Sequence, residues 1–261
     1  MLVWSNIENR VFTIAIAAIV LGQLLRIDWI NTWLFYLINT PASLLPSALL
    51  DVLTLLGDSA THVLFIAWIG VYKPKILLPA LIFAIVSLLL TDLLKSWFDV
   101  ARPAFALGSN NIFINGPTLL AGAFPSGHSI STAGMAVFLL RYVQASRALL
   151  AVAGVVIVSR VMVGAHWPAD VVVGAGIGAL VALLAIRLGE QIKLTKQVSY
   201  WLPLAIHWLF IGCSFLILGV SHAEVDTWLA TNLLILMLIS WGLRSFGIDW
   251  RLTMSAAKRS S

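Results

Sequence analysis

The sequence has little charge and almost no cysteine. Only 10% of its 261 residues are charged, against roughly 25% in soluble domains, and 61% are hydrophobic. This composition excludes an ordinary soluble domain and indicates an integral membrane protein. The single cysteine, Cys213, lies inside an apolar run, so disulfide bonds, a zinc site and thiol catalysis are not expected. The net charge of +5 forms no basic stripe with interleaved aromatic residues, which argues against nucleic-acid binding.

Long apolar runs divide the chain into about eight candidate membrane spans, each of which needs about 20 residues. The runs lie at 11–26, 59–72, 76–94, 128–143, 148–164, 169–187, 201–220 and 228–246. The first run could be a signal peptide, but Glu8 before it and the lack of a clean A-x-A site favour a span. The run 59–72 is short, so we expect its helix to extend back toward Leu53. The fold class expected is all-α, a polytopic transmembrane helical bundle.

Residues 29–57 are apolar but interrupted by two prolines, and their tryptophans suit a membrane interface. We interpret this stretch as one or two interfacial helices that lead into the second span. The organisation expected is a six-span core at 1–195, which includes these helices. Two additional spans and a basic cytoplasmic tail are expected at 196–261.

The distribution of Lys and Arg predicts the orientation in the membrane. With the N-terminus inside, 12 of the 16 basic residues fall on inner connections and 4 on the outer side, so both termini are expected to be cytoplasmic. The outer basic residues are Arg26, Lys95, Arg102 and Arg160. Three of these four lie in polar clusters, which makes the exceptions to the rule informative.

The first cluster is the outer segment from Lys95 through Arg102 to Pro103. A cation at mid-bilayer costs roughly 2.5–3.5 kcal/mol on insertion scales, whereas at an interface it can snorkel. Either Lys95 or Arg102 alone could therefore be an anchoring cation. Anchoring cations favour the inner side, however, so the outer position weakens that interpretation.

The second cluster, Pro125-Ser126-Gly127-His128, stands where an outer loop meets the run 128–143. Exposed N–H groups at a helix N-terminus bind anions, and glycine lets a ligand approach the backbone closely. Ser126 could cap the helix or donate a hydrogen bond to an oxyanion. The simpler alternative is a Pro-Ser helix start with an interfacial histidine. A hydrolase nucleophile is not expected at Ser126, because its flanks do not form G-x-S-x-G.

The third cluster runs from Ser159-Arg160 to His166 and Asp170. Because His166 and Asp170 are four residues apart, they can share one face of a helix end. A carboxylate beside an imidazole fixes its tautomer and raises its basicity, the arrangement of a nucleophilic or basic histidine. Taken alone, the pair could also be a satisfied interfacial contact.

The expected topology places all three clusters on the same side of the membrane. Together they provide three cations, two imidazoles, one carboxylate and backbone donors, namely Lys95, Arg102, Arg160, His128, His166, Asp170, Ser126 and Gly127. Such a set suits a multiply charged tetrahedral anion. Paired outward carboxylates, as in a magnesium phosphatase, are lacking, so no metal or other cofactor is expected. The set predicts phosphoryl transfer through a phosphohistidine.

The spacings K-x6-R-P, P-S-G-H and S-R-x5-H-x3-D resemble the three-part signature of the type 2 phosphatidic acid phosphatase superfamily, which includes vanadium haloperoxidases. The stretch Leu53–Asp58 is similar to one that this family carries ahead of its second core span. The resemblance covers about residues 50–187. Membrane members of the family commonly have six spans, so the two expected C-terminal spans depart from it.

The resemblance implies a role for each residue of the clusters. His166 would attack phosphorus, Asp170 would orient it, and His128 would protonate the leaving oxygen. The remaining residues would hold the phosphate and stabilise the transition state, namely Lys95, Arg102, Ser126, Gly127 through its amide, and Arg160.

The function implied is that of a metal-independent membrane phosphatase, acting at the periplasmic face of a bacterial inner membrane. Its substrate would be a phosphomonoester or diphosphate of a phospholipid or polyprenyl lipid. Candidates are undecaprenyl diphosphate, phosphatidylglycerol phosphate, phosphatidate and a lipid A phosphate. One alternative is a phosphotransferase that passes the group to another lipid, and another is a non-catalytic lipid-binding protein or transporter.

A last pattern is a stripe of small residues, Gly174, Gly176 and Gly178, in the run 169–187. A dinucleotide-binding fingerprint would follow a strand, and no strand is expected before these glycines. The stripe therefore predicts close packing against other helices.

Overall fold

The computed structural model describes residues 2–195, 198, 201–202, 204–210 and 212–213. This part of the chain is helical and contains no strand, which confirms the all-α expectation there. The α-helices are α1 (Leu2–Leu24), α2 (Asp28–Ala42), α3 (Ser47–Gly57), α4 (Ser59–Tyr72), α5 (Leu77–Phe98), α6 (Pro103–Leu107), α7 (Gly127–Phe138), α8 (Arg147–Met162) and α9 (Pro168–Gln191).

Each of the first six apolar runs forms a helix. The run 128–143 is α7 continued by a π-helical turn at Leu139–Val143. Within the described residues, three helices are long and apolar enough to cross a membrane, or four if the bent pair α3–α4 counts as one span. They are Trp4–Leu24, Pro74–Leu107 and Pro168–Gln191. The run 201–220 lies partly, and 228–246 wholly, outside the described residues, so the count of eight spans stays a prediction.

The helix α4 does not run back continuously to Leu53 as expected. Asp58 caps it instead, since the Asp58 carboxylate accepts a hydrogen bond from the Ala60 N–H at 2.7 Å. The chain bends by 60° between α3 and α4 at this point. The stretch 29–57 therefore forms two separate helices, α2 and α3, and α2 exposes Trp29 (72%) and Trp33 (60%).

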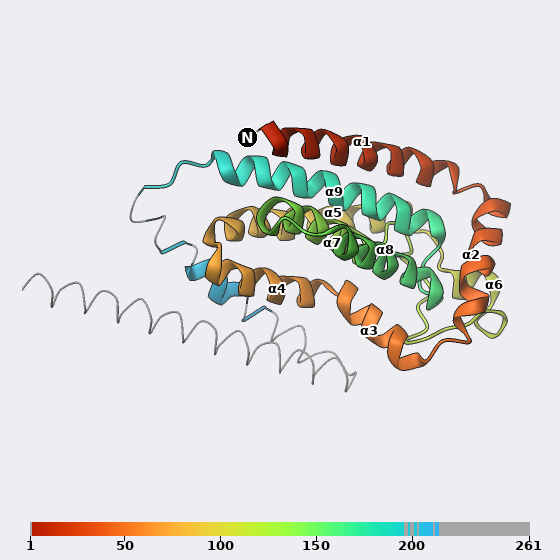
Figure 1. Cartoon of the computed structure of the whole chain (residues 1–261). Coiled ribbons are helices and arrows are strands. Elements are labelled where there is room, and N and C mark those ends of the chain that lie inside the picture. The colour runs from red at the N-terminus through yellow and green to blue at the C-terminus, as the bar shows by residue number, and fades with distance from the viewer. Residues whose placement is uncertain (1, 196–197, 199–200, 203, 211, 214–261) are drawn as a thin grey trace, which may run out of the picture.

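The helix α9 is the centre of the bundle and packs against α1, α5 and α7 (Figure 1). Its glycines make this close approach possible. A Cβ at Gly178 would lie 2.1 Å from the Ile130 carbonyl oxygen of α7, and one at Gly176 would lie 2.7 Å from the Ala15 carbonyl oxygen of α1. Lipid tails are as apolar as these side chains, so close packing rather than loss of water holds the helices together. The small-residue stripe is thus confirmed as a packing surface.

The connections that carry the polar clusters gather at the end of the bundle where Figure 1 places α2, α3 and α6. The long loop between α5 and α7 folds back on itself there. The Arg102 N–H donates to the Leu120 carbonyl at 2.9 Å, and the Ala123 N–H donates to the Val100 carbonyl at 2.9 Å. These bonds place the first cluster beside the segment that leads into the second.

Candidate active site

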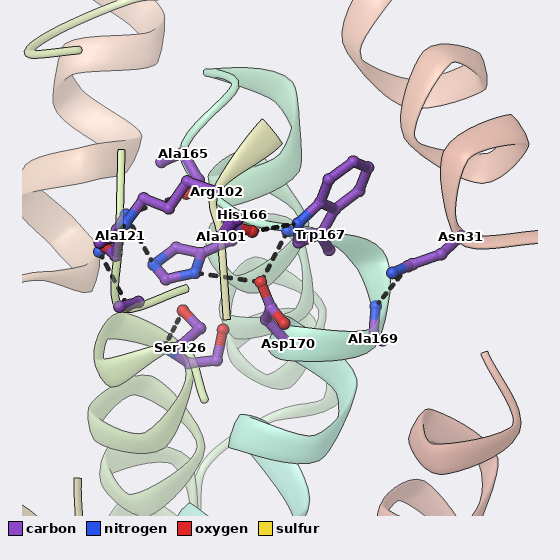
Figure 2. Close-up of polar contacts among 12 residues, drawn as sticks. Asn31, Ala101, Arg102, Ala121, Ser126, Ala165, His166, Trp167, Ala169 and Asp170 are labelled. Carbon is purple, nitrogen blue, oxygen red and sulfur yellow. Dashed lines mark hydrogen bonds and ion pairs between the residues drawn. The ribbon is translucent and has the colours of Figure 1, made fainter. Parts of the chain in front are cut away.

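The third cluster contacts both the first and the second cluster, so the three lie together (Figure 2). From the first, Arg102 Nη1 donates to the Ala165 carbonyl at 2.9 Å and lies 3.4 Å from Nε2 of His166. From the second, the Ser126 N–H donates to the Asp170 carbonyl at 3.2 Å. Segments up to 64 residues apart in sequence thus meet around one imidazole ring.

His166, just before α9, lies beside Asp170 in the first turn of that helix, as their spacing predicts. The Asp170 carboxylate oxygen Oδ2 is 3.5 Å from Nδ1 of His166 and accepts a hydrogen bond from the Trp167 N–H at 2.9 Å. The His–Asp contact is longer than an ordinary N–H···O hydrogen bond of about 2.7–3.2 Å. Catalytic hydrogen bonds are often long without substrate and tighten on binding, so this geometry suits an orienting carboxylate.

The His166 ring is only 3% exposed and lies in the connection between α8 and α9. Burial lowers its pKa well below the usual 6.5, and the positive charges of Arg102, Arg160 and Lys95 lower it further. The ring is therefore neutral at pH 7. With a proton on Nδ1 facing Asp170, the Nε2 lone pair is free to act as a nucleophile.

Arg102 is 7% exposed and donates to three backbone carbonyls in two segments of the chain. Its Nε donates to the Ala121 carbonyl at 2.8 Å, its Nη1 to Ala165 and its Nη2 to the Gly122 carbonyl at 3.3 Å. At least three of its five N–H donors are thus engaged by the protein. Arg102 fixes the loops around His166 as well as placing a positive charge beside it.

Arg160 is equally buried, at 7% exposure, but is held differently. Its Nη1 donates to the Thr54 hydroxyl of α3 at 2.7 Å, and its Nε is buried with no hydrogen-bond partner among the described residues. A buried charged donor without a partner is costly. An incoming phosphate oxygen would satisfy it.

The second cluster forms the N-terminus of α7. Ser126 is fully buried and caps the helix, since its hydroxyl accepts a hydrogen bond from the Ser129 N–H at 3.4 Å. Gly127 is the first helical residue. A Cβ at Gly127 would meet its nearest neighbour, Thr91, at an ordinary 3.8 Å, so helix packing does not require glycine here. Without a side chain at this position, an anion could approach the N–H groups at the start of α7 closely.

His128 and Lys95 complete the group. His128 lies beside the α3–α4 bend, since its Cδ2 is 3.2 Å from where a Cβ on Gly57 would stand. It lies near His166, Arg160 and Lys95. Lys95 is half-buried at the end of α5 and interacts electrostatically with Arg102 and Asp170. The eight residues expected from the sequence therefore lie together at one end of the bundle, while their roles remain predictions.

A family model described as the PAP2 superfamily matches residues 76–193, which hold all three clusters. This segment of the chain belongs to the PAP2 superfamily. Among curated relatives, the Lipid A 1-phosphatase of Rhizobium johnstonii is 37% identical over 148 residues, 53% of this chain and 57% of the relative. Phosphatidylglycerophosphatase B of Bacillus subtilis is 33% identical over 122 residues, 42% of this chain and 56% of the relative. The chain thus spans less than two thirds of the length of either relative.

Two solved structures share the PAP2 fold. The crystal structure of Aquifex aeolicus LpxE is 27% identical, with a TM-score of 0.51 over 60% of this chain and 94% of that one. The second is the crystal structure of the first transmembrane PAP2 type phosphatidylglycerolphosphate phosphatase from Bacillus subtilis. Its TM-score is 0.52 over 70% of this chain and 98% of that one. Its sequence identity is 24%, so it shows a likeness of fold alone. The chain is an integral membrane protein, as its long apolar helices and its PAP2 match indicate.

Sequence reasoning missed three residues near the site that lie outside the PAP2 match. Thr54 binds Arg160, and it falls in the Leu53–Asp58 stretch, which was its only signal. Asn39 of α2 binds the backbone next to the third cluster. His62 of α4 shares a hydrogen bond of 2.6 Å with the Ser131 hydroxyl, one turn beyond His128. No motif marks either Asn39 or His62.

Proposed function

We propose that the chain is a membrane phosphatase that releases phosphate from a lipid headgroup at the outer face. One observation carries the proposal: a buried, neutral His166 has Nε2 turned toward a guanidinium and Nδ1 toward a carboxylate. A nucleophile oriented on one side and surrounded by cations on the other suits attack on a phosphate dianion.

The first chemical step forms a bond between His166 Nε2 and phosphorus, and breaks the bond from phosphorus to the lipid oxygen. His128 gives its proton to that oxygen, so the lipid leaves as an alcohol or a shortened phosphate. Asp170 holds the Nδ1–H as positive charge develops on the His166 ring.

In the second step water attacks the phosphohistidine and transfers a proton to His128. Inorganic phosphate leaves, and both histidines return to their starting state. Lys95, Arg160, the Gly127 amide and Ser126 stabilise the charge on the phosphoryl oxygens, the largest requirement of phosphoryl transfer. No step calls for a metal ion.

A lipid phosphate is the proposed substrate class, with lipid A 1-phosphate and phosphatidylglycerol phosphate as the first candidates, because relatives carry those names. The expected orientation, with both termini cytoplasmic, puts the site at the periplasmic side of an inner membrane. The exposed tryptophans of α2 lie at the same end of the bundle and suit the interface where such headgroups lie.

The test is phosphate release from a panel of purified lipid phosphates by the full chain in detergent, with His166→Ala as the control. We expect the wild type to release phosphate from at least one lipid. In the variant the rate of release should fall by a factor of about 1,000 or more, the loss typical when a member of a catalytic triad is removed. Acid-labile, alkali-stable radiolabel on the wild-type protein would identify the phosphohistidine. Labelled lipid product in place of free phosphate would indicate a phosphotransferase. Equal release by the variant would contradict the role of His166 as the nucleophile. No release from any lipid by the wild type would instead favour a non-catalytic lipid-binding protein or transporter.

A further inference from the structure

The two buried arginines of the site are held by different kinds of acceptor. Arg102 donates to three backbone carbonyls, whereas Arg160 donates through Nη1 to a single side chain, the hydroxyl of Thr54, at 2.7 Å. These two residues are 106 positions apart, on α3 and on the last turn of α8. The hydroxyl thus connects the third cluster to a helix outside the PAP2 match.

The α3–α4 bend lies against α7 and α8, and this packing places Thr54 close to Arg160. A Cβ at Gly57 would lie 3.0 Å from the Val156 side chain of α8 and 3.2 Å from the His128 ring of α7. Both distances are tighter than ordinary contacts, so glycine lets the end of α3 rest directly against the two helices that carry Arg160 and His128. Thr54 lies one turn before this glycine.

The chemical nature of the acceptor matters. A carboxylate would orient the guanidinium but would also neutralise its charge, whereas a hydroxyl orients it and leaves the full charge for a substrate. Asp58 is near enough to influence Arg160, but its Oδ1 accepts from the Ala60 N–H at 2.7 Å. Among the described residues, Arg160 forms no ion pair with a carboxylate.

Resting on the proposed function, we infer that Thr54 is a positioning residue for the phosphate site. Its hydroxyl fixes the Arg160 guanidinium by one end and leaves the buried, unpartnered Nε–H for a phosphoryl oxygen. Without this acceptor, Nη1 would lose its partner and the guanidinium would have no fixed orientation in the site.

The test compares Thr54→Val, which keeps the shape and removes the hydroxyl, with Thr54→Ser, which restores it. Thr61→Val is the matched control, because Thr61 is a buried threonine (2% exposed) in the neighbouring helix α4. A hydrogen bond to a charged group predicts that Thr54→Val lowers kcat/KM roughly 10- to 100-fold. Thr54→Ser should recover most of the activity, and Thr61→Val should retain it.

A double-mutant cycle separates positioning from a general loss of stability. In an Arg160→Ala background, Thr54→Val should cause little further loss of kcat/KM, because the group it positions is gone. An equal loss in both backgrounds would overturn the inference. So would full activity of Thr54→Val in the wild-type background.

A binding measurement tests the role of Thr54 separately from the proposed function. Orthovanadate is added to the purified protein, and its binding is monitored by tryptophan fluorescence. Thr54→Val and Arg160→Ala should weaken vanadate binding alike, and Thr61→Val should not. Wild-type protein that binds vanadate but releases no phosphate from any lipid would contradict the proposed function, while the variants still decide the role of Thr54. Unchanged vanadate affinity in Thr54→Val, or no vanadate binding by the wild type, would contradict that role.

Discussion

The side-chain amide of Asn39 both donates a hydrogen bond to the backbone of Phe113 and accepts one from it. Its Nδ2 donates to the Phe113 carbonyl at 2.8 Å, and its Oδ1 accepts from the Phe113 N–H at 3.0 Å. The same Nδ2 also donates to the Met162 carbonyl at 2.9 Å, and Asn39 is only 1% exposed. One residue of α2 thus connects the long loop between α5 and α7 to the last turn of α8, just before His166.

Substituting Asn39 by Asp should destabilise the protein and lower activity with it. The carboxylate cannot donate, so the carbonyls of Phe113 and Met162 would face a buried oxygen, at a cost of about 2 kcal/mol or more. The measurement is the thermal unfolding midpoint in detergent together with phosphate release. Asn111→Asp is the control, because Asn111 is exposed and donates to the Leu107 carbonyl alone. An unchanged midpoint in Asn39→Asp would show that α2 does not hold the loop.

Gly178→Ala should separate α9 from α7. The new Cβ would lie 2.1 Å from the Ile130 carbonyl oxygen, so the helices must shift, and overpacking of this kind costs about 1–3 kcal/mol. Because α7 begins at the Ser126 cap and carries His128, activity should fall along with the unfolding midpoint. Gly154→Ala on α8 meets nothing within 4 Å and should be neutral, or stabilising by up to about 1 kcal/mol from helix propensity. Equal behaviour of the two variants would contradict the packing described for α9.

The polar clusters could be located from the sequence because a charged residue in an apolar chain is costly and must have a reason. The spacing between His166 and Asp170 even predicted that they share a face. Thr54 and Asn39 gave no comparable signal, since a lone neutral polar residue in an apolar helix looks like any other. Their partners lie 74 to 123 residues away in sequence, and mostly on the backbone, so only the folded chain reveals them. The break at Asp58 was missed because the apolar character continues on both sides of it.

Removal of metal ions should leave turnover unchanged. The candidate site surrounds the phosphate position with cations and contains one carboxylate, Asp170, which already accepts a hydrogen bond from the Trp167 N–H. Such a set repels a divalent cation and supplies the charge that a metal would otherwise provide. The measurement is phosphate release after dialysis against a strong chelator. A complete loss that magnesium restores would contradict the proposed mechanism.

Asp170→Asn should lower kcat strongly without unfolding the protein. Asparagine still offers an oxygen to the Trp167 N–H, so the start of α9 is preserved. It cannot stabilise positive charge on His166, and its amide nitrogen can favour the wrong tautomer, so we expect a loss of about 100-fold or more. Steady-state kinetics and the unfolding midpoint are measured on the same preparation. Wild-type kcat in this variant would show that the 3.5 Å contact between the two side chains plays no part in turnover.

The separate roles proposed for His128 and His166 can be tested with two substrates whose leaving groups differ in their need for a proton. If His128 protonates the leaving oxygen, His128→Ala should slow release from a lipid phosphate by about 100- to 10,000-fold, the usual contribution of general acid catalysis. A 4-nitrophenyl ester has a leaving oxygen that needs no proton, so formation of its nitrophenolate should be far less affected. His166→Ala should abolish both reactions, because the nucleophile is needed whatever the leaving group. Equal losses on the two substrates in His128→Ala would exclude the acid role, since a residue that binds the phosphate acts on both alike.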